Sequence, residues 1–422
     1  MDSSIFDNII ERRGTGSLKY DCAASRGFPD GILPLWVADM DFRVADPIAA
    51  ALRAAAGHGI FGYTVPDDAY YGALRSWWCE RFGYHFEPRS VVITPGVVFS
   101  LAQAVRAFTE PGDGVLIQRP VYYPFSEVIE CNRRKIVNSP LALGDDGRYG
   151  IDFEDFERKL AEERPKLFIM SSPHNPVGRV WERWELERMG DLCIAYGCLV
   201  VSDEVHADFT YGENRHTVFA TVKDAFRENS IVCTSPSKTF NLAGLQVSNI
   251  VIEDNALRRR YKSEIEMSGY SQPNTMGVAA CRAAYEEGGP WLDGLLEYLA
   301  GNLDLLGSYF PVVGAARGAD SVCGNQQAEA GSHVPQARAG SGVRLVPVEG
   351  TYLPWLDFRG TDIAHSRVDD LMVNEAGVWL DSGTMFGPEG EGFQRINIAC
   401  PRSILRKAAE SISAAVENHI SE

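Results

Sequence analysis

Four short apolar runs along the chain each end in a cluster of polar residues. Each run has the length of a strand, and together they cover residues 91–93, 167–170, 198–201 and 231–233. Helical patterns lie between several of them, including residues 99–108. Strands that alternate with helices predict an α/β fold with a mainly parallel sheet. The carboxyl ends of parallel strands meet at one crevice, so we expect the polar clusters to converge there.

One of these clusters contains Lys238, just behind the hydroxyls of Ser235 and Ser237. In apolar surroundings an amine loses solvation, which lowers its pKa and leaves it free to form an imine with a carbonyl. A single lysine after a strand is usually a surface residue. The catalytic interpretation therefore depends on the residues that accompany Lys238.

A phosphate site is predicted after the first apolar run. Gly96, Val97 and Val98 open a helix there, and the free N–H groups and dipole of a helix start hold phosphate. The hydroxyls of Ser235 and Ser237 are expected to add further donors.

The remaining clusters supply groups that suit an aromatic ring. Asp203 fits a partner for a protonated ring nitrogen, the Asn175 amide fits a donor to a ring oxygen, and Tyr122 is expected to lie against the ring face. Phosphate, ring contacts and the imine-forming Lys238 together describe pyridoxal 5′-phosphate, an electron sink for carbanions. His206 is predicted either to tune the ring's hydrogen bonds or simply to pack. No Cys/His cluster has metal-ligand spacing, so no metal is expected.

This set of motifs resembles the fold-type-I pyridoxal-phosphate enzymes of the aspartate aminotransferase superfamily, over nearly the whole chain. Further motifs are similar to the MalY/PatB subgroup of cystathionine and cysteine β-lyases, also called C–S lyases. They are WVADMDF from Trp36, FGYT from Phe61, PVYYPF from Pro120, DEVHAD from Asp203 and KTFNLAGLQ from Lys238.

The resemblance implies several further roles. Arg395, in the motif GFQRINI, would bind the substrate carboxylate through its two-pronged guanidinium, helped by backbone at Val37 and Ala38. Gln246 stands where generic aminotransferases carry a phosphate-binding arginine, so the phosphate would rely on amides and hydroxyls. Tyr63 would reach the phosphate of the neighbouring subunit, which implies a homodimer with shared active sites.

The implied reaction is the cleavage of L-cystathionine or a related cysteine S-conjugate to a thiol, pyruvate and ammonia. Lys238 would remove the α-proton of this small amino-acid substrate. Two alternatives stay open: a class I/II aminotransferase, which uses the same residues, and a lyase with an added regulatory protein-binding role.

Length and composition favour two domains, since 422 residues exceed one ordinary core and 45% of them are apolar. We expect a large cofactor-binding domain at 46–285, and a smaller, discontinuous α+β domain formed by 1–45 and 286–422. In the smaller domain, patterns predict helices at 291–306 and 402–419 and a strand at 351–358. The segment 314–342, rich in Gly, Ala and polar residues, reads as a flexible insertion.

The net charge of −17 disfavours nucleic acid and anionic membranes as partners. No apolar run approaches bilayer length, and the first residues do not resemble a signal segment. Nine cysteines with scattered spacing suggest reduced thiols, so a cytoplasmic location is expected.

Overall fold

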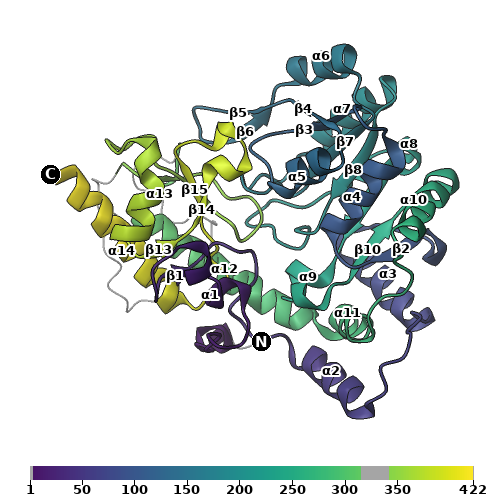
Figure 1. Cartoon of the computed structure of the whole chain (residues 1–422), viewed down its shortest axis with the longest axis horizontal. Helices are drawn as coiled ribbons and strands as arrows, with labels where there is room; N and C mark the ends of the chain where they lie inside the picture. Colours follow the sequence, from purple (N-terminus) through teal and green to yellow (C-terminus); the bar gives the residue numbers. More distant parts are fainter. Residues whose placement is uncertain (1–2, 315–341, 422) are drawn as a thin grey trace.

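The computed structural model describes residues 3–314 and 342–421. At its centre is a seven-stranded sheet of order β2-β10-β9-β8-β7-β3-β4 (Figure 1). In that order, its strands are β2 (Val91–Thr94), β10 (Ser248–Val251), β9 (Ser230–Thr234), β8 (Leu199–Asp203), β7 (Leu167–Ser171), β3 (Gly114–Ile117) and β4 (Lys135–Asn138). Only β10 is antiparallel to its neighbours, so the other strands share one direction. The predicted α/β fold with a mainly parallel sheet is confirmed.

Strands β7, β8 and β9, in the middle of this sheet, are buried on both faces, which explains why they contain continuous apolar runs rather than alternating ones. Along β7, Leu167 and Ile169 point to one layer of helices, whereas Phe168 and Met170 point to the other. The first layer contains α4 (Val97–Phe108), α5 (Pro124–Cys131) and α10 (Asn255–Met267). The second contains α6 (Phe153–Glu163) and α7 (Arg183–Ala195).

The other elements of this half of the molecule lie around the sheet. Helices α2 (Asp46–His58) and α3 (Asp68–Phe82) both pack on α11 (Thr275–Glu287). Two short helices, α8 (Asp224–Glu228) and α9 (Pro236–Thr239), flank β9, and the strands β5 (Leu141–Leu143) and β6 (Tyr149–Ile151) form a separate antiparallel pair. Pro236 lies in the first turn of α9, and Phe240 is the cap residue at which the helix ends.

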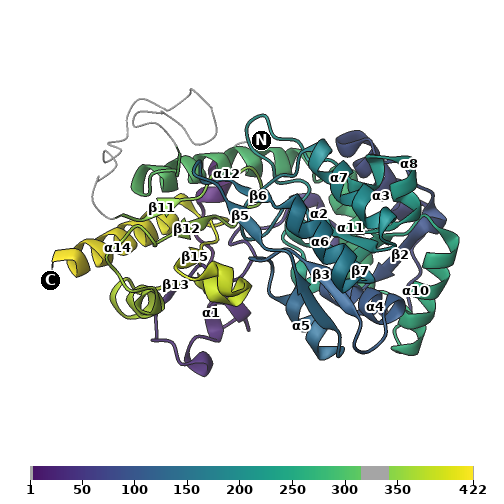
Figure 2. The ribbon, with the colours of Figure 1, turned by 90° about the horizontal axis from the view of Figure 1, so that it is seen from above.

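The C-terminal elements gather at the end of the molecule away from the large sheet (Figures 1 and 2). A four-stranded antiparallel sheet joins β11 (Arg344–Leu345), β12 (Trp355–Asp357), β15 (Phe393–Arg395) and β14 (Asp381–Ser382). The long helices α12 (Gly289–Tyr309) and α14 (Arg402–Ser421) pack on each other, and α13 (Val368–Asp370) lies near α14 in Figure 1.

The N-terminal segment packs against these C-terminal elements. Strand β1 (Leu33–Pro34) pairs in parallel with β13 (Val378–Trp379), and α1 (Leu18–Asp21) precedes it. The Phe6 ring lies 5.6 Å from that of Trp291 and 5.5 Å from that of Tyr298 on α12. These contacts support a discontinuous small domain, although the boundaries at 45 and 285 stay a prediction.

The structure departs from the sequence patterns in the small domain. The predicted helices at 291–306 and 402–419 extend to Gly289–Tyr309 and Arg402–Ser421. The predicted strand at 351–358 is strand only at Trp355–Asp357, because Thr351 has a left-handed φ of 69° and Pro354 has no N–H to donate. Of the predicted insertion 314–342, residues 315–341 lie outside the described residues. Among the helices described, none is both long and apolar enough to span a bilayer.

Candidate active site

The polar clusters predicted from the sequence follow the carboxyl ends of strands that run in the same direction. Gly96 follows β2, Asn175 follows β7, Asp203 ends β8, and Lys238 lies on α9 directly after β9. Since β7, β8 and β9 are adjacent and β2 is separated from β9 only by β10, the sheet brings the clusters to one edge, as predicted.

Lys238 contacts the N-terminal segment across this edge. Its Nζ donates a hydrogen bond of 2.7 Å to the Ala38 carbonyl, which also accepts 3.0 Å from the Tyr352 hydroxyl. The Val37 carbonyl accepts 2.7 Å from Asn397 Nδ2. A carboxylate needs donors, and both carbonyls are acceptors. At Val37 and Ala38, only the backbone N–H groups could therefore donate hydrogen bonds to a substrate carboxylate.

Burial lowers the pKa of the Lys238 amine to about 8. The positive guanidinium of Arg395 contributes to this lowering, whereas the carboxylates of Asp39 and Asp203 act in the opposite direction. A neutral amine is both a nucleophile and a base, so the lowered pKa increases the fraction of Lys238 in the form that the predicted chemistry requires.

Asp203 is a buried carboxyl group without an ion-pair partner among the described residues. It is 6% exposed, and its Oδ1 accepts a long hydrogen bond of 3.2 Å from the Val205 N–H. Burial therefore raises the pKa of Asp203 to about 7. Such a carboxylate gains from a cation placed beside it, so it fits the predicted pairing with a protonated ring nitrogen.

His206 is buried beside the same site. Burial, and then the positive charges of Lys238 and Arg395, lower its pKa, so its ring is neutral. Its Nδ1 has no hydrogen-bond partner in the described part of the chain. This unpaired polar atom is compatible with either predicted role of His206.

Arg395 is almost fully buried on β15, where several partners fix its guanidinium. It donates 3.0 Å to Asn175 Oδ1 and 3.0 Å to the Trp36 carbonyl, and it forms an ion pair with Asp381. Its Nε has no partner within the described residues. With Oδ1 engaged, Asn175 offers a ligand its Nδ2 donor, as the predicted contact to a ring oxygen requires. Tyr122 belongs to the same group, because its N–H donates 3.0 Å to the Asn175 carbonyl.

The predicted phosphate site lies at the start of α4. Gly96 is the residue before the helix, and its φ of 140° lies in the region that favours glycine. A side chain at Gly96 would begin 3.8 Å from Gln246 Oε1, so Gln246 borders the same helix start. The N–H groups of Val97 and Val98, in the first turn, have no acceptor within the helix, which leaves them available to a phosphate.

The two serines near Lys238 differ in the hydrogen bonds that they form. The Ser235 hydroxyl donates 2.8 Å to the Val247 carbonyl and caps α9 by accepting from the Ser237 N–H. A hydroxyl has one proton, so in this arrangement Ser235 has none left for a phosphate. The role of Ser235 as a phosphate donor stays a prediction, and it requires the hydroxyl to turn away from the Val247 carbonyl. Ser237, which is partly exposed, keeps that predicted role.

Tyr63 lies on the surface, 95% exposed, rather than inside the site of its own chain. It lines a pocket of about 710 Å³ together with residues 269–276. This pocket borders the predicted phosphate site, because Asn274 Nδ2 contacts the Gln246 carbonyl at 3.3 Å. The exposed position of Tyr63 is compatible with the predicted contact between Tyr63 and the phosphate in a neighbouring subunit.

Two residues of the site were missed by the sequence analysis. Asp381, which holds Arg395, follows the apolar residues 378–380, the same kind of signal that identified Asp203. Tyr352, which holds the Ala38 carbonyl, follows no pattern that distinguishes it from other tyrosines.

Comparison with known proteins places the chain in a family. The model of aminotransferase class I and II matches residues 32–308. Cystathionine β-lyase PatB of Bacillus subtilis is 40% identical, covering 97% of this chain and 99% of that protein. Protein MalY of Escherichia coli is 32% identical, covering 97% of this chain and 98% of that protein.

Two solved structures, each 33% identical, have the same fold. A PLP-bound putative aminotransferase from Clostridium difficile superposes with a TM-score of 0.88 and covers 97% of this chain and 99% of its own. Cystalysin from Treponema denticola, which contains pyridoxal 5′-phosphate, gives 0.87 and covers 98% and 99%. The chain therefore belongs to the aminotransferase class I and II family, with fold-type-I architecture, and within it to the subgroup of PatB and MalY.

Proposed function

We propose that the protein is a pyridoxal-phosphate-dependent carbon–sulfur β-lyase that cleaves L-cystathionine or related cysteine S-conjugates. One observation carries the proposal. The partly buried Lys238 amine, with a pKa lowered to about 8, lies at the same sheet edge as Asp203, and Arg395 reaches that edge from β15 by donating to Asn175. The chain that carries this arrangement is 40% identical to a cystathionine β-lyase over 97% of its length.

The residues at the sheet edge match the cofactor group by group. The N–H groups of the α4 start and the Ser237 hydroxyl would hold its phosphate, and Lys238 would attach it. Asp203 would hold a proton on the ring nitrogen, and Asn175 would donate to the ring oxygen. When bound, pyridoxal phosphate supplies an electron sink that stabilises negative charge at the substrate's α-carbon.

The protein's own side chains bind and orient the substrate around this group. Arg395 would take the α-carboxylate, and its contacts with Asp381 and the Trp36 carbonyl fix the direction of the guanidinium. Lys238 then accepts the α-proton, which requires a neutral amine. The bond between the β-carbon and sulfur breaks, and its electron pair leaves with the sulfur as a thiolate. Addition of water completes the balance, giving pyruvate, ammonia and the thiol.

An aminotransferase is the second candidate, favoured by the family model and by the putative aminotransferase that shares the fold. Incubating the holoenzyme with L-cystathionine and no keto acid separates the two, because only a lyase releases pyruvate over many turnovers. A panel of cystathionine, cysteine, cystine and alkyl-cysteines, scored for pyruvate and thiol, then identifies the leaving group. Absence of pyruvate with every substrate, together with amino transfer to an added keto acid, would reverse the assignment.

Replacing Arg395 with lysine is expected to raise KM for L-cystathionine about 10- to 100-fold and to change kcat less. Lysine keeps the positive charge but loses the fork that meets a carboxylate with two parallel hydrogen bonds. Steady-state kinetics of pyruvate release measures the effect. Arg367→Lys, at an exposed arginine, is the matched control. Equal KM values for the two variants would contradict the carboxylate-binding role.

We also propose a homodimer in which Tyr63 serves the partner's site. The segment that carries Tyr63 exposes Ile60, Phe61 and Val65 by 71%, 62% and 80%. An apolar stretch this exposed is typical of an interface.

Subunit mixing tests this proposal. Lys238→Ala and Tyr63→Ala chains are each expected to be poorly active alone. After unfolding and refolding as a mixture, hybrid dimers would contain one site with both residues intact and regain activity. A mixture no more active than its two components, combined with a monomer in analytical ultracentrifugation, would contradict shared sites.

A cytoplasmic location and an added regulatory role stay proposals from the sequence. All cysteines of the described residues are free, which is compatible with a reducing compartment. A protein partner that still bound the Lys238→Ala variant would support a regulatory role separate from catalysis.

A further inference from the structure

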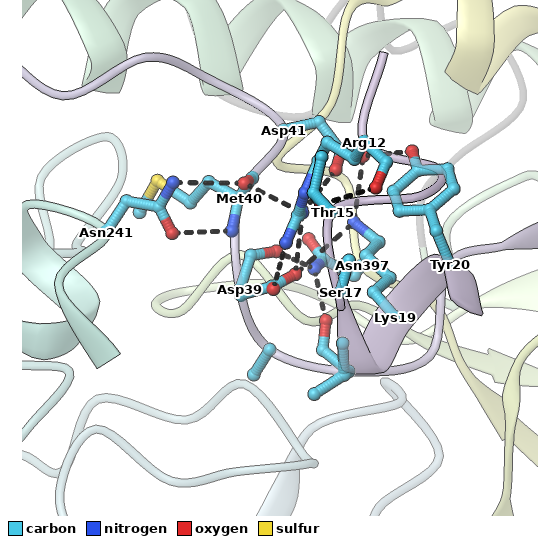
Figure 3. Close-up of polar contacts among 12 residues, drawn as sticks. Arg12, Thr15, Ser17, Lys19, Tyr20, Asp39, Met40, Asp41, Asn241 and Asn397 are labelled. Atoms are coloured by element: carbon cyan, nitrogen blue, oxygen red, sulfur yellow. Dashed lines mark hydrogen bonds and ion pairs between the residues drawn. The ribbon is translucent and has the colours of Figure 1, made fainter. Parts of the chain in front are cut away.

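A group of charged side chains in the N-terminal segment gathers around Asp39 and Asp41 (Figure 3). Lys19 is fully buried, 2.8 Å from Asp41 and 3.7 Å from Asp39. Arg12 lies 2.6 Å from Asp39 and 2.7 Å from Asp41. The Tyr20 hydroxyl donates 3.0 Å to Asp41. We call these five residues the N-terminal ion cluster; its two cations and two carboxylates balance in charge.

The cluster is joined to the Lys238 loop through Met40, which lies between its two aspartates. Asn241, three residues after Lys238, accepts from the Met40 N–H at 3.0 Å. Its Nδ2 donates to the carbonyls of Met40 and Phe42, both at 3.0 Å. The left-handed φ of 56° at Asn241 turns this amide toward the segment.

The same segment is held from the C-terminal side. Asn397 Nδ2 donates 2.7 Å to both the Val37 and the Asp39 carbonyls, and the Asp41 N–H donates 2.9 Å to the Ala399 carbonyl. The Ala38 carbonyl, which receives the Lys238 amine, therefore lies in a stretch fixed on both sides.

Stability alone does not account for this arrangement. Removing charges from water is costly, and apolar residues of similar size stabilise a fold equally well or better. A buried charged or polar group can instead fix one register of the chain, as a buried asparagine does in coiled coils. The register is what matters here, because a shift of one residue would move the carbonyl away from Lys238.

We propose that Arg12 and Lys19 are positioning residues for the proposed reaction. Their ion pairs fix residues 37–41, and with them the carbonyl that receives the Lys238 amine. They also neutralise Asp39, which would otherwise act on that amine as an uncompensated negative charge. The proposal rests on the proposed function, in which Lys238 is the reactive group.

The charged groups that act on Lys238 are Arg395, Asp203 and Asp39. Arg395 is held by β14 and β15, and Asp203 belongs to β8, so the ion cluster controls only Asp39. Removing Arg12 leaves Asp39 with Lys19 as its remaining cation, at 3.7 Å. The more exposed negative charge would then favour the protonated form of Lys238.

The full-length chain, freed of cofactor, provides a direct test. Acetylation of Lys238 by acetic anhydride, followed against pH by peptide mass spectrometry, gives the midpoint at which the amine becomes reactive. Arg12→Gln is expected to raise this midpoint by about 0.5 to 1 pH unit, and Arg12→Lys to restore most of it. Asp39→Asn is expected to lower it. Arg13→Gln is the matched control. Within the described residues the Arg13 guanidinium pairs with exposed Glu11 at 3.5 Å and lies 5.5 Å from the centre of the Tyr20 ring, and no ion pair joins it to Asp39 or Asp41.

Opposite shifts from the two partners of one ion pair cannot arise from general loosening of the structure. A midpoint in Arg12→Gln equal to that of Arg13→Gln would overturn the proposal. If Arg12→Gln does not fold, an unchanged midpoint in Asp39→Asn overturns it equally. In the holoenzyme, Arg12→Gln is expected to reduce kcat for L-cystathionine about 10-fold with a smaller change in KM, as for a misplaced reactive group. The labelling needs no substrate, so it can fail or succeed independently of pyruvate release.

Discussion

Replacing Lys238 with alanine is expected to reduce pyruvate release from L-cystathionine by at least about 10,000-fold. The loss combines the general base that accepts the α-proton with the amine that attaches the cofactor. Alanine supplies neither group, and other residues at the sheet edge cannot substitute. Asp203 is assigned to the ring nitrogen and Arg395 to the substrate carboxylate, and the lowered pKa of His206 makes its imidazole a weak base. Pyruvate formation under saturating substrate and cofactor measures the effect.

The control for this variant is Lys262→Ala, at an exposed lysine on α10. Borohydride reduction of the native holoenzyme, followed by peptide mapping, should place the cofactor on the Lys238 peptide. Wild-type rates in Lys238→Ala, or a tag on another lysine, would refute the assignment of the reactive amine.

Replacing Asp203 with asparagine is expected to lower kcat about 100- to 1,000-fold while making the cofactor-free protein more stable. The amide carries no charge, so it cannot hold a proton on the ring nitrogen, and charge at the α-carbon is less well stabilised. The stabilisation has a different origin. Burial raises the pKa of Asp203 from 3.8 to about 7, so the native chain binds this proton more tightly than the unfolded chain.

The pH dependence of this stabilisation follows from the sign of the pKa shift. Below about pH 4 the Asp203 carboxyl is protonated in both the native and the unfolded chain, so it does not lower the free energy of unfolding. The loss of free energy of unfolding grows as pH rises and reaches its full size above about pH 7. At about 1.4 kcal/mol per pKa unit, it reaches on the order of 4 kcal/mol. The advantage of Asp203→Asn should therefore appear as pH rises from 4 to 7.

Thermal unfolding of the cofactor-free variants at pH 5, 7 and 8.5 tests this expectation. Asp224→Asn, at a fully exposed carboxylate, should leave the unfolding temperature unchanged. An Asp203→Asn protein less stable than the wild type at pH 8.5 would mean that the carboxylate already has a cationic partner in the cofactor-free chain. Full activity in this variant would remove Asp203 from the ring contact.

The sequence predicted four of the seven strands of the large sheet, β2, β7, β8 and β9, because their apolar residues are buried against helices or neighbouring strands. A residue such as Phe168 or Ile169 must be apolar whichever helix layer it meets, so a strand such as β7 appears as an uninterrupted run. The small domain was harder to predict. Its strands are two or three residues long, and a local feature such as the left-handed φ of Thr351 interrupts the pattern.

The amino-acid sequence by itself determined the family and the residues at the strand ends, because strand direction alone brings Asn175, Asp203 and Lys238 to one edge. Only the tertiary structure decided which atoms remain free there. The Ser235 hydroxyl donates its hydrogen bond to the Val247 carbonyl, and Asp381 forms an ion pair with Arg395. The N-terminal ion cluster reaches Lys238 through contacts spanning about two hundred positions, such as Asn241 with Met40. Hydrogen-bond partners are set by distance in space, and a local pattern carries no record of that distance.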